Sequence, residues 1–387
     1  MKRKPTFILK IGLLLLTLCA FSLVNCSDDT ALEEFSEIVS EEDEVEESTD
    51  GENDQSGEGD ANGDETGQDG DGDETGQNGD GTGQDGDGDE TGQDGSDESE
   101  VDEVFGLSAS REPWENFDLS DWVIDTPAFD TDRLSLRHGE LDWDQLVNSD
   151  SRPFFFTHTD GGMRFVSTVG GAKTSENTKF SRSELREMLR AGNRNISTTG
   201  DNGNNWALGY QPENANHGGR NGELKATLRV NKVTITGDGL HAGRTIIGQI
   251  HASKDEPARL YYRKLPDAEY GCIYLEHEIR EGDDVTFNLI GDEKCEGNGP
   301  SNGIKLDELF SYEIINDGAE ITVNIRRGDE NEPIIATTTV DMNSEDSGYD
   351  VEDEWMYYKA GLYTQNNTGD DDDTDVATFY RLSNSHD

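Results

Sequence analysis

The chain has 387 residues and a formal net charge of −54, because 85 Asp and Glu residues outnumber 31 Lys and Arg residues. An acidic balance of this size argues against nucleic-acid binding, since contacts to phosphates need a positively charged surface. It also makes any cluster of basic residues informative, because such a cluster opposes the charge of the chain as a whole.

Residues 1–26 are typical of an export signal. Lys2, Arg3 and Lys4 precede an apolar run over 7–24 that is too short and too close to the N-terminus to favour a membrane span. The run ends in Leu-Val-Asn-Cys, which resembles a bacterial lipoprotein cleavage box with Cys26 as the lipidated residue. Ordinary signal cleavage is the alternative, because Asn is unusual directly before that cysteine. We expect an outer-membrane or cell-surface lipoprotein that meets the membrane only through its lipid, or else a secreted or periplasmic protein.

Residues 27–104 predict a disordered linker. They hold 33 acidic residues and no Lys or Arg, and they are rich in Gly with few bulky side chains. Such a segment cannot bury enough apolar surface to offset its chain entropy, and its charges repel one another. Thr-Gly-Gln recurs at Thr66, Thr75, Thr82 and Thr91, with alternating Asp and Gly between some copies. The Asp alternation resembles part of a calcium loop, but no closing Glu completes one, so a solvated spacer is the favoured interpretation.

Residues 105–387 carry a formal net charge of −25, since residues 1–26 contribute +4 and the linker −33. This length fits one large all-β domain, and two small domains are also compatible with it. In a domain this acidic, an anionic ligand has to be bound by a local cluster of positive charge. Arg182, Arg186 and Lys359 are candidates for that cluster, with Arg190, Arg194 and Arg220 as candidate neighbours.

Segments typical of β-strands recur through this domain and are separated by Gly, Asn and Asp turn signals. The predicted strands are 154–157, 163–168, 224–230, 245–251, 259–263, 273–277, 285–290, 310–315, 321–326, 334–339, 357–364 and 378–382. Long amphipathic helical patterns are scarce, although 141–147 could hold a short helix. Two packed antiparallel sheets follow from this pattern.

Cysteine use agrees with export. Cys19 leaves with the signal and Cys26 is the candidate lipidation site, so Cys272 and Cys295 are the thiols left to the domain. In an oxidising compartment they are expected to form a disulfide, and a loop of this length is worth about 3 kcal/mol on chain-entropy grounds. Two unpaired thiols are the alternative.

Three short segments, read as strands, each place polar side chains on one face and apolar side chains on the other. The polar sets are Arg182 with Glu184 and Arg186, Gln249 with His251, and Lys359 with Tyr363 and Gln365. Ile250, Ala360 and Leu362 fall on the opposite side, where a core would lie. If the three strands are neighbours, their shared polar face is suited to an anionic substrate.

The same segments resemble the three signature blocks of polysaccharide lyase family 7, the alginate lyases, and they occur in the family's order. The blocks are Arg-Ser-Glu-Leu-Arg-Glu-Met at 182–188, Gln-Ile-His at 249–251 and Tyr-Tyr-Lys-Ala-Gly-Leu-Tyr-Thr-Gln at 357–365. Weaker similarity at 122–127, 154–157 and 164–166 extends the resemblance over most of 112–382. It implies a β-jelly-roll, an all-β sandwich of two antiparallel sheets with a concave substrate groove, over a catalytic domain at 105–387.

The resemblance also implies an activity. The expected reaction cleaves the glycosidic bond of alginate by β-elimination and leaves unsaturated uronate ends. The Ile in Gln249-Ile250-His251 is similar to the family variant associated with guluronate-containing blocks, so a preference for these blocks is expected. No cofactor is expected to be required, and the protein is expected to act as a monomer with alginate as its partner.

Residue roles follow from the chemistry together with the resemblance. The C5 proton beside an ionised carboxylate is hard to remove, so donors and cations that bind the carboxylate must stabilise the charge that grows there. The resemblance implies Arg182 and Gln249 at the carboxylate, His251 as the base for guluronate units and Tyr363 as the proton donor to the leaving oxygen. For mannuronate units, Tyr363 is expected to do both.

The remaining polar residues of these blocks are expected to support that chemistry. Glu184 stands between two arginines on its face, so we expect it to be ionised and to hold their guanidinium groups. Lys359 is expected to bind substrate or to tune Tyr363. Arg186 and Gln365 are expected to contact substrate further along the groove.

The three segments also have other interpretations. An Arg-x-Glu-x-Arg strand alone is more often a solvated ladder of ion pairs, and a Tyr-rich strand is usually packing. A glycoside hydrolase needs two carboxylates that flank the bond, and no Glu-x-Asp-x-x-Glu strand is present. A non-catalytic carbohydrate-binding β-sandwich for an anionic polysaccharide is the rival, and the presence of both His251 and Tyr363 argues against it.

No metal or nucleotide chemistry is indicated by the sequence, since no Cys/His ligand cluster and no phosphate loop is found. The run of four Asp residues at 370–373 is expected to be a solvated loop, with a bound structural calcium as the alternative. Four further histidines are expected to be surface or structural residues: His158, His217, His241 and His277.

Overall fold

The computed structural model describes residues 105–129, 138–141, 143–147, 152–175, 178–212 and 218–387. The export signal, Cys26, the acidic linker and His217 lie outside the described residues, and what was predicted for them stays a prediction. Within the described ranges, no helix is both long enough and apolar enough to cross a membrane.

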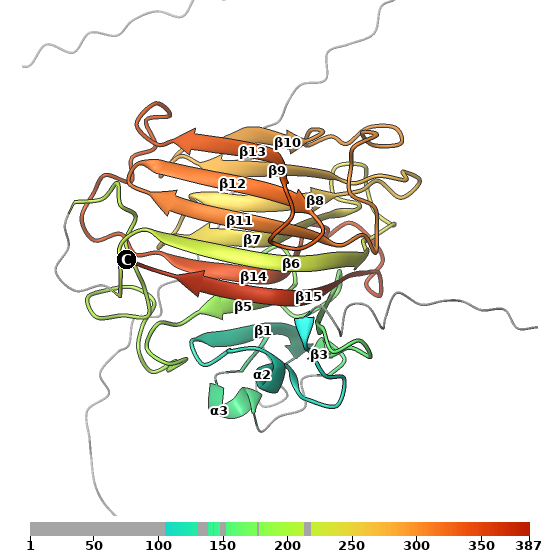
Figure 1. The fold of residues 1–387 in the computed structure, drawn as a ribbon, viewed down its shortest axis with the longest axis horizontal. Coiled ribbons are helices and arrows are strands. Elements are labelled where there is room, and N and C mark those ends of the chain that lie inside the picture. Colours follow the sequence, from blue (N-terminus) through green and yellow to red (C-terminus); the bar gives the residue numbers. More distant parts are fainter. Residues whose placement is uncertain (1–104, 130–137, 142, 148–151, 176–177, 213–217) are drawn as a thin grey trace, which may run out of the picture. The chain divides into compact units, whose positions relative to one another are not determined.

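The domain is a sandwich of two antiparallel sheets, one stacked on the other, with the strands of both running in nearly the same direction (Figure 1). In spatial order, the eight-stranded sheet contains β10 (Asp284–Ile290), β9 (Cys272–Glu278), β8 (Ala258–Arg263), β7 (Arg244–His251), β14 (Tyr357–Thr364), β5 (Arg182–Glu187), β1 (Trp122–Phe129) and β2 (His138–Leu141). The seven-stranded sheet contains β13 (Ile334–Asp341), β12 (Glu320–Arg327), β11 (Phe310–Asp317), β6 (Gly222–Lys232), β15 (Thr374–Ser385), β4 (Met163–Thr168) and β3 (Phe155–Thr157). The predicted all-β sandwich is confirmed.

Each predicted strand overlaps a strand of the structure, and the 182–186 block forms β5. The short helix expected within 141–147 is α3 (Trp143–Leu146). Three elements were not predicted, namely β1, β2 and the helix α2 (Pro113–Asn116). Helix α2 begins with Pro at its first turn and is capped because the backbone N–H of Glu112 donates to Glu115 Oε2 at 2.9 Å.

The hydrophobic core lies between the two sheets. The eight-stranded sheet contributes Leu185, Ile250, Ala360 and Leu362, which are fully buried in one cluster with Leu228 and Phe379 of the seven-stranded sheet. The apolar side of each predicted block therefore faces the core, as the alternation of its residues indicates. The opposite side of β5, β7 and β14 is left to carry the polar residues.

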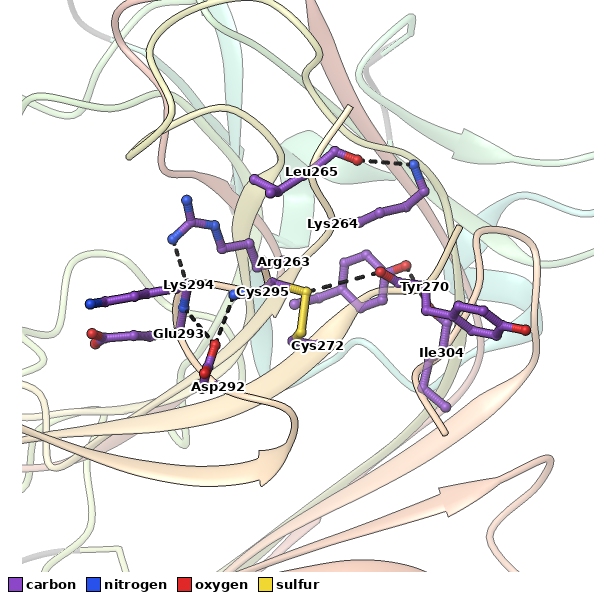
Figure 2. The surroundings of a disulfide bond; sticks show 11 residues. Arg263, Lys264, Leu265, Tyr270, Cys272, Asp292, Glu293, Lys294, Cys295 and Ile304 are labelled. Carbon is purple, nitrogen blue, oxygen red and sulfur yellow. Dashed lines mark hydrogen bonds between the residues drawn. A yellow bond between two sulfur atoms is a disulfide. The ribbon is translucent and has the colours of Figure 1, made fainter. Parts of the chain in front are cut away.

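A disulfide closes the loop that follows β10. Cys272, at the start of β9, is bonded to Cys295, and their Cα atoms are 5.7 Å apart. Figure 2 shows the loop folded around this bond, with Asp292 accepting hydrogen bonds from the backbone N–H groups of Lys294 and Cys295. Arg263 of β8 donates to the carbonyl oxygen of Glu293 at 2.6 Å. The predicted disulfide is confirmed, and it fixes this loop to the outer strands of the eight-stranded sheet.

Candidate active site

The three predicted blocks lie side by side in the middle of the eight-stranded sheet, as β7, β14 and β5 (Figure 1). Their register places Lys359 of β14 opposite Gln249 on one side and Arg186 on the other. Tyr363 lies opposite Arg182, and Tyr357 lies opposite His251. The polar residues that the sequence singled out therefore share one face of the sheet.

A β-bulge keeps the polar side chains of β7 on that face. Ile246 pairs with Tyr261 of β8 and Gly248 pairs with Leu260, so β7 holds one extra residue at this point. Ile247 belongs to the core, and a Cβ at Gly248 would meet the ring of Tyr312 from the other sheet at 2.8 Å. Two consecutive residues thus face the core, which restores the alternation beyond the bulge. As a result Gln249 and His251 point to the same side as Ile246.

Glu184 is the centre of the charged contacts in this face. Its Oε2 lies 3.1 Å from Lys359 Nζ and 3.4 Å from Arg182 Nη1, while its Oε1 accepts a hydrogen bond from Gln249 Nε2. Glu184 is completely buried, and these three partners are at most 4% exposed. One carboxylate thus orients side chains from all three strands, and two of its partners are cations.

The partner of Arg186 differs from the prediction. Instead of Glu184, it contacts Glu140 of β2, with Nη2 at 2.7 Å from Oε2. Arg194 contacts the other oxygen of Glu140 at 2.8 Å. The expected pairing of Glu184 with both arginines is therefore wrong, because a strand that was not predicted brings a second carboxylate to the edge of the face. Arg190 and Arg220 instead bind backbone carbonyl groups, those of Asn202 and Gln211 among them.

Gly361 allows β14 to lie close to β5 at this point. Its φ is +144°, and an added Cβ would lie 2.7 Å from the carbonyl oxygen of Ser183 and 2.8 Å from the Cα of Glu184. Any larger residue would be strained and would push the two strands apart. The close approach holds Lys359 and Tyr363 near the side chains of β5.

His251 is held by contacts at both ring nitrogens. Its Nδ1 lies 2.6 Å from the carbonyl oxygen of Ala252, and its Nε2 lies 3.0 Å from Glu256 Oε1. The ring stacks on Tyr357 with centroids 4.8 Å apart and an interplanar angle of 14°. These contacts fix the plane of the imidazole, and Glu256 is a residue that the sequence did not single out.

Tyr363 lies beneath a cation. The guanidinium carbon of Arg182 is 3.8 Å from the centre of the Tyr363 ring, and Phe180 meets the ring edge-on with centroids 6.1 Å apart. The cation predicted to influence Tyr363 was Lys359, but Lys359 Nζ contacts Glu184. Arg182 therefore takes that position, where it can stabilise negative charge on the phenol oxygen.

Gln365 follows β14 and is 5% exposed. Its backbone N–H donates to the carbonyl oxygen of Arg244 at 3.0 Å. Among the described residues, its buried side-chain Nε2 has no hydrogen-bond partner. A buried amide without a partner costs free energy, so this nitrogen is suited to a ligand that brings an acceptor.

The polar face extends beyond the predicted blocks onto β8 and β9. Arg244 Nε donates to Tyr274 Oη at 2.8 Å, and its guanidinium lies 4.5 Å from the centre of the Tyr261 ring. Burial raises the pKa of both Tyr261 and Tyr274, so these phenols stay protonated and cannot act as bases. Alternation in 259–263 and 273–277 was the sequence signal that could have placed these residues on the same face.

Three histidines that were predicted to be surface or structural residues contact other groups of the fold. His277 is completely buried, with its Nδ1 2.7 Å from the Pro257 carbonyl oxygen and its Nε2 2.6 Å from Ser347 Oγ. His158 and His241 contact Asp160 and Asp238 at 3.0 and 2.8 Å. In the parts of the chain that the structure describes, no three His, Cys, Asp or Glu side chains are grouped so that they could hold a metal ion.

The aspartate run at 370–373 was predicted to be solvated, and this is correct for its first three residues only. Asp373 is 6% exposed and accepts hydrogen bonds from the backbone N–H groups of Ile235 at 2.7 Å and Thr236 at 2.8 Å. Burial opposes the charge of Asp373, but the hydrogen bonds from Thr236 and Ile235 hold its pKa below the ordinary value. This carboxylate joins two loops of the fold.

Comparison with known proteins agrees with the fold. The family model described as alginate lyase matches residues 117–386. An alginate lyase from Klebsiella pneumoniae is 44% identical over 286 residues, which cover 71% of this chain and 91% of that protein.

Solved structures give the same result. A crystal structure of an alginate lyase from Klebsiella pneumoniae has a TM-score of 0.66 at 42% identity, covering 72% of this chain and 99% of the other. A variant of the family 7 alginate lyase A1-II′, in complex with a GGMG substrate, has a TM-score of 0.50 at 25% identity, covering 71% of this chain and 96% of the other. An exolytic alginate lyase from Zobellia galactanivorans shares the fold, with a TM-score of 0.52 at 19% identity, covering 71% and 97%. The chain therefore belongs to the alginate lyase family, polysaccharide lyase family 7, and is an enzyme of that class.

Proposed function

We propose that this enzyme cleaves alginate by β-elimination with the side chains of β5, β7 and β14, and that it prefers guluronate-containing blocks. The observation that carries the proposal is the shared face itself. It brings an imidazole, a phenol, a guanidinium and an amide together from three adjacent strands. These are the groups that elimination from a uronate requires.

Binding of the substrate carboxylate is the first requirement. Arg182 and Gln249 are both held by Glu184, so their remaining donors are oriented before substrate arrives. A cation and an amide donor on the uronate carboxylate stabilise the negative charge that develops when the C5 proton leaves. Because the site is almost completely buried, these interactions are stronger than they would be in water.

The proton transfers complete the reaction. His251 accepts the C5 proton, and the electron pair of that bond forms the C4–C5 double bond. The C4–O bond breaks, its electron pair stays on the oxygen, and Tyr363 donates its phenolic proton to that oxygen. Arg182, above the Tyr363 ring, stabilises the resulting phenolate until water returns the proton.

Glycoside hydrolysis is the less suitable chemistry for this face. That reaction needs one carboxyl as the acid and a second carboxylate as the base or nucleophile. Here Glu184 contacts Lys359 and Arg182, whereas Glu256 contacts His251 and Arg259. Both carboxylates are held by positively charged or proton-bearing partners on the enzyme.

The preference for guluronate rests on the Gln249-Ile250-His251 block. Ile250 is completely buried in the core, so it can influence specificity only by shifting Gln249 and His251. We expect wild-type enzyme to act faster on guluronate blocks than on mannuronate blocks. Ile250→Val should narrow the ratio between the two rates, with a stability cost of about 1 kcal/mol. Equal wild-type rates on both block types would contradict the preference and leave the lyase activity standing.

The experiment that tests the proposed reaction is direct. Elimination creates a conjugated unsaturated uronate, which absorbs ultraviolet light. Hydrolysis creates no such double bond, so its products lack this absorbance. We expect the purified protein to generate this absorbance with alginate. New reducing ends without the absorbance would indicate hydrolysis, and binding of alginate without either signal would indicate a non-catalytic binding protein.

We also propose that Cys26 anchors the enzyme by a lipid and that residues 27–104 act as a spacer between the anchor and the catalytic domain. The proposal rests on the Leu-Val-Asn-Cys sequence and on the charge of the linker. Wild-type protein should sediment with membranes after expression in a lipoprotein-processing bacterium, and Cys26→Ser should be released. Equal distribution of both proteins would favour ordinary secretion.

A further inference from the structure

Glu256 is a buried carboxylate that the proposed reaction does not use. It lies in the turn before β8, is 3% exposed, and places Oε1 3.0 Å from Nε2 of His251. The other ring nitrogen lies 2.6 Å from the carbonyl oxygen of Ala252. Both nitrogens of the candidate base therefore face oxygen atoms.

The positions of the protons follow from these two contacts. A carbonyl oxygen can only accept a hydrogen bond, so Nδ1 carries a hydrogen and donates it to Ala252. The 3.0 Å contact between Nε2 and Glu256 is favourable only if one proton lies between these two groups. That proton has to pass to solvent water before Nε2 can accept another one from C5 of a uronate.

Glu256 is itself held in place. Its Oε2 lies 3.7 Å from Nη1 of Arg259, and its backbone N–H donates to Glu278 Oε2 at 3.0 Å. Arg259 in turn contacts Glu276 of β9 at 3.5 Å and also Asp284 of β10. Burial raises the pKa of Glu278, and hydrogen bonding with Glu256 opposes that rise. The carboxylate beside His251 thus has an orientation fixed from the side away from the ring.

Several other charged or titratable groups surround the pair and contribute to its field. On the elements packed around His251 they are Arg259 from β8, Tyr357 and Lys359 from β14, Glu276 and Glu278 from β9, Glu184 from β5, and Asp255, Arg280 and Glu354 around the turn after β7. Glu256 lies at hydrogen-bonding distance from Nε2, 3.0 Å away. Its charge is therefore expected to have the largest influence on that nitrogen.

We propose that Glu256 is a positioning residue that orients His251 and retains a proton on its Nε2, and that it thereby sets the lower pH limit of turnover. The proposal rests on the proposed role of His251 as base. A negative carboxylate stabilises a positive ring more than a neutral amide in the same place would. Together with the carbonyl oxygen of Ala252, Glu256 fixes the plane of the ring.

The test compares pH profiles of kcat/KM for wild type, Glu256→Gln, Glu256→Asp and Glu276→Gln. Glu256→Gln removes the charge but keeps the shape, so the acidic limb should move to lower pH by about one unit. Glu256→Asp keeps the charge on a shorter side chain, so its limb should stay near the wild-type position while kcat falls. Glu276→Gln is the matched control, because it removes a buried carboxylate of the same face that contacts Arg259 but not His251. The acidic limb of the kcat/KM profile of Glu276→Gln should stay within half a pH unit of the wild-type limb.

A second readout does not depend on turnover. Nitrogen NMR of the His251 ring should show Nε2 losing its proton at lower pH in Glu256→Gln than in wild type. An unchanged acidic limb together with an unchanged ring titration in Glu256→Gln would overturn the proposal. If His251→Ala kept wild-type turnover, the role of His251 as base would fail, whereas the ring titration would still decide whether Glu256 controls the proton.

Discussion

The two sheets of this protein use charge in different ways. On the outer face of the seven-stranded sheet, the ion pair between Lys225 and Glu223 has an N–O distance of 2.9 Å and leaves both side chains about one-third exposed. On the polar face of the eight-stranded sheet, the pair between Lys359 and Glu184 has a similar distance, 3.1 Å, but the side chains are 3% and 0% exposed. The two N–O distances are similar, but only the pair between Lys359 and Glu184 is buried.

The difference in exposure between the two ion pairs helps to locate the active site. An exposed ion pair gains little, because water already solvates both charges. A buried pair loses that solvation, so it persists only where its partners are held in good geometry and is often retained for a specific task. In this fold, Arg182 and Glu184 of β5 and Lys359 of β14 form such a buried set, next to Gln249 of β7.

Removing one carboxylate from each sheet should give the largest difference in stability between the two faces. Glu184→Gln leaves Arg182 and Lys359 buried beside a neutral amide, so we expect a loss of roughly 3–5 kcal/mol in the free energy of unfolding. Glu223→Gln, the matched control on the outer face, should cost less than about 1 kcal/mol. Urea unfolding followed by tryptophan fluorescence measures both values. Equal losses would mean that burial does not distinguish the two faces.

Reduction of the disulfide tests the outer strands of the eight-stranded sheet. The bond between Cys272 and Cys295 constrains the unfolded chain, so its loss should cost about 3 kcal/mol. The double variant with both cysteines changed to Ser should show the same loss, and reductant should not destabilise it further. Stability unchanged by reductant in the wild type would contradict the expected contribution.

His386 provides a smaller effect that depends on pH. Its Nε2 lies 2.7 Å from Glu187 Oε1 at the end of β5, so it ties the C-terminus to the eight-stranded sheet. Burial works against the charge of His386, but the hydrogen bond and charge of Glu187 raise its pKa above the ordinary value of 6.5. The folded state therefore binds this proton more tightly than the unfolded state, and the stabilisation is complete below pH 6.5 and is lost as pH rises through the folded pKa.

Substitution of His386 makes that dependence measurable. His386→Ala should cost roughly 1.5–3 kcal/mol below pH 6.5, because a charged hydrogen bond is lost and Glu187 stays buried. The difference between wild type and variant should shrink at higher pH. The measurement is the urea midpoint of wild type and of His386→Ala across the pH range. A difference between the two midpoints that stays constant with pH would mean that the charge of His386 is irrelevant.

Much of the site could be predicted, because it lies on regular strands. Alternation places Arg182, Glu184 and Arg186 on one face and Leu185 on the other, and no long-range information is needed for that assignment. The order of the three blocks then indicated the family. The resemblance to that family predicted that three segments far apart in the sequence form one site. The disulfide could be predicted in the same way, since the domain contains only two cysteines.

The features that sequence could not predict depend on register and on irregular backbone. Strict alternation along 244–251 would have placed Thr245 and Ile247 on the same face as Gln249, and only the bulge corrects this. Arg186 binds Glu140 because β2 pairs with β1, and neither segment was predicted to be a strand. Glu256 reaches His251 from a turn, where side-chain direction has no period. Asp373 is buried by the loop at 235–236, although its neighbours in the run are exposed.

We propose that the buried polar face of β5, β7 and β14 catalyses elimination with Tyr363 as the proton donor. The most direct measurement compares ultraviolet absorbance from alginate for wild type, Tyr363→Phe and the control His158→Ala, whose ring contacts Asp160 rather than this face. We expect wild type and His158→Ala to produce the unsaturated uronate at equal rates, and Tyr363→Phe to be slower by about 10²–10⁴-fold while remaining folded. Wild-type rates in Tyr363→Phe would contradict the account.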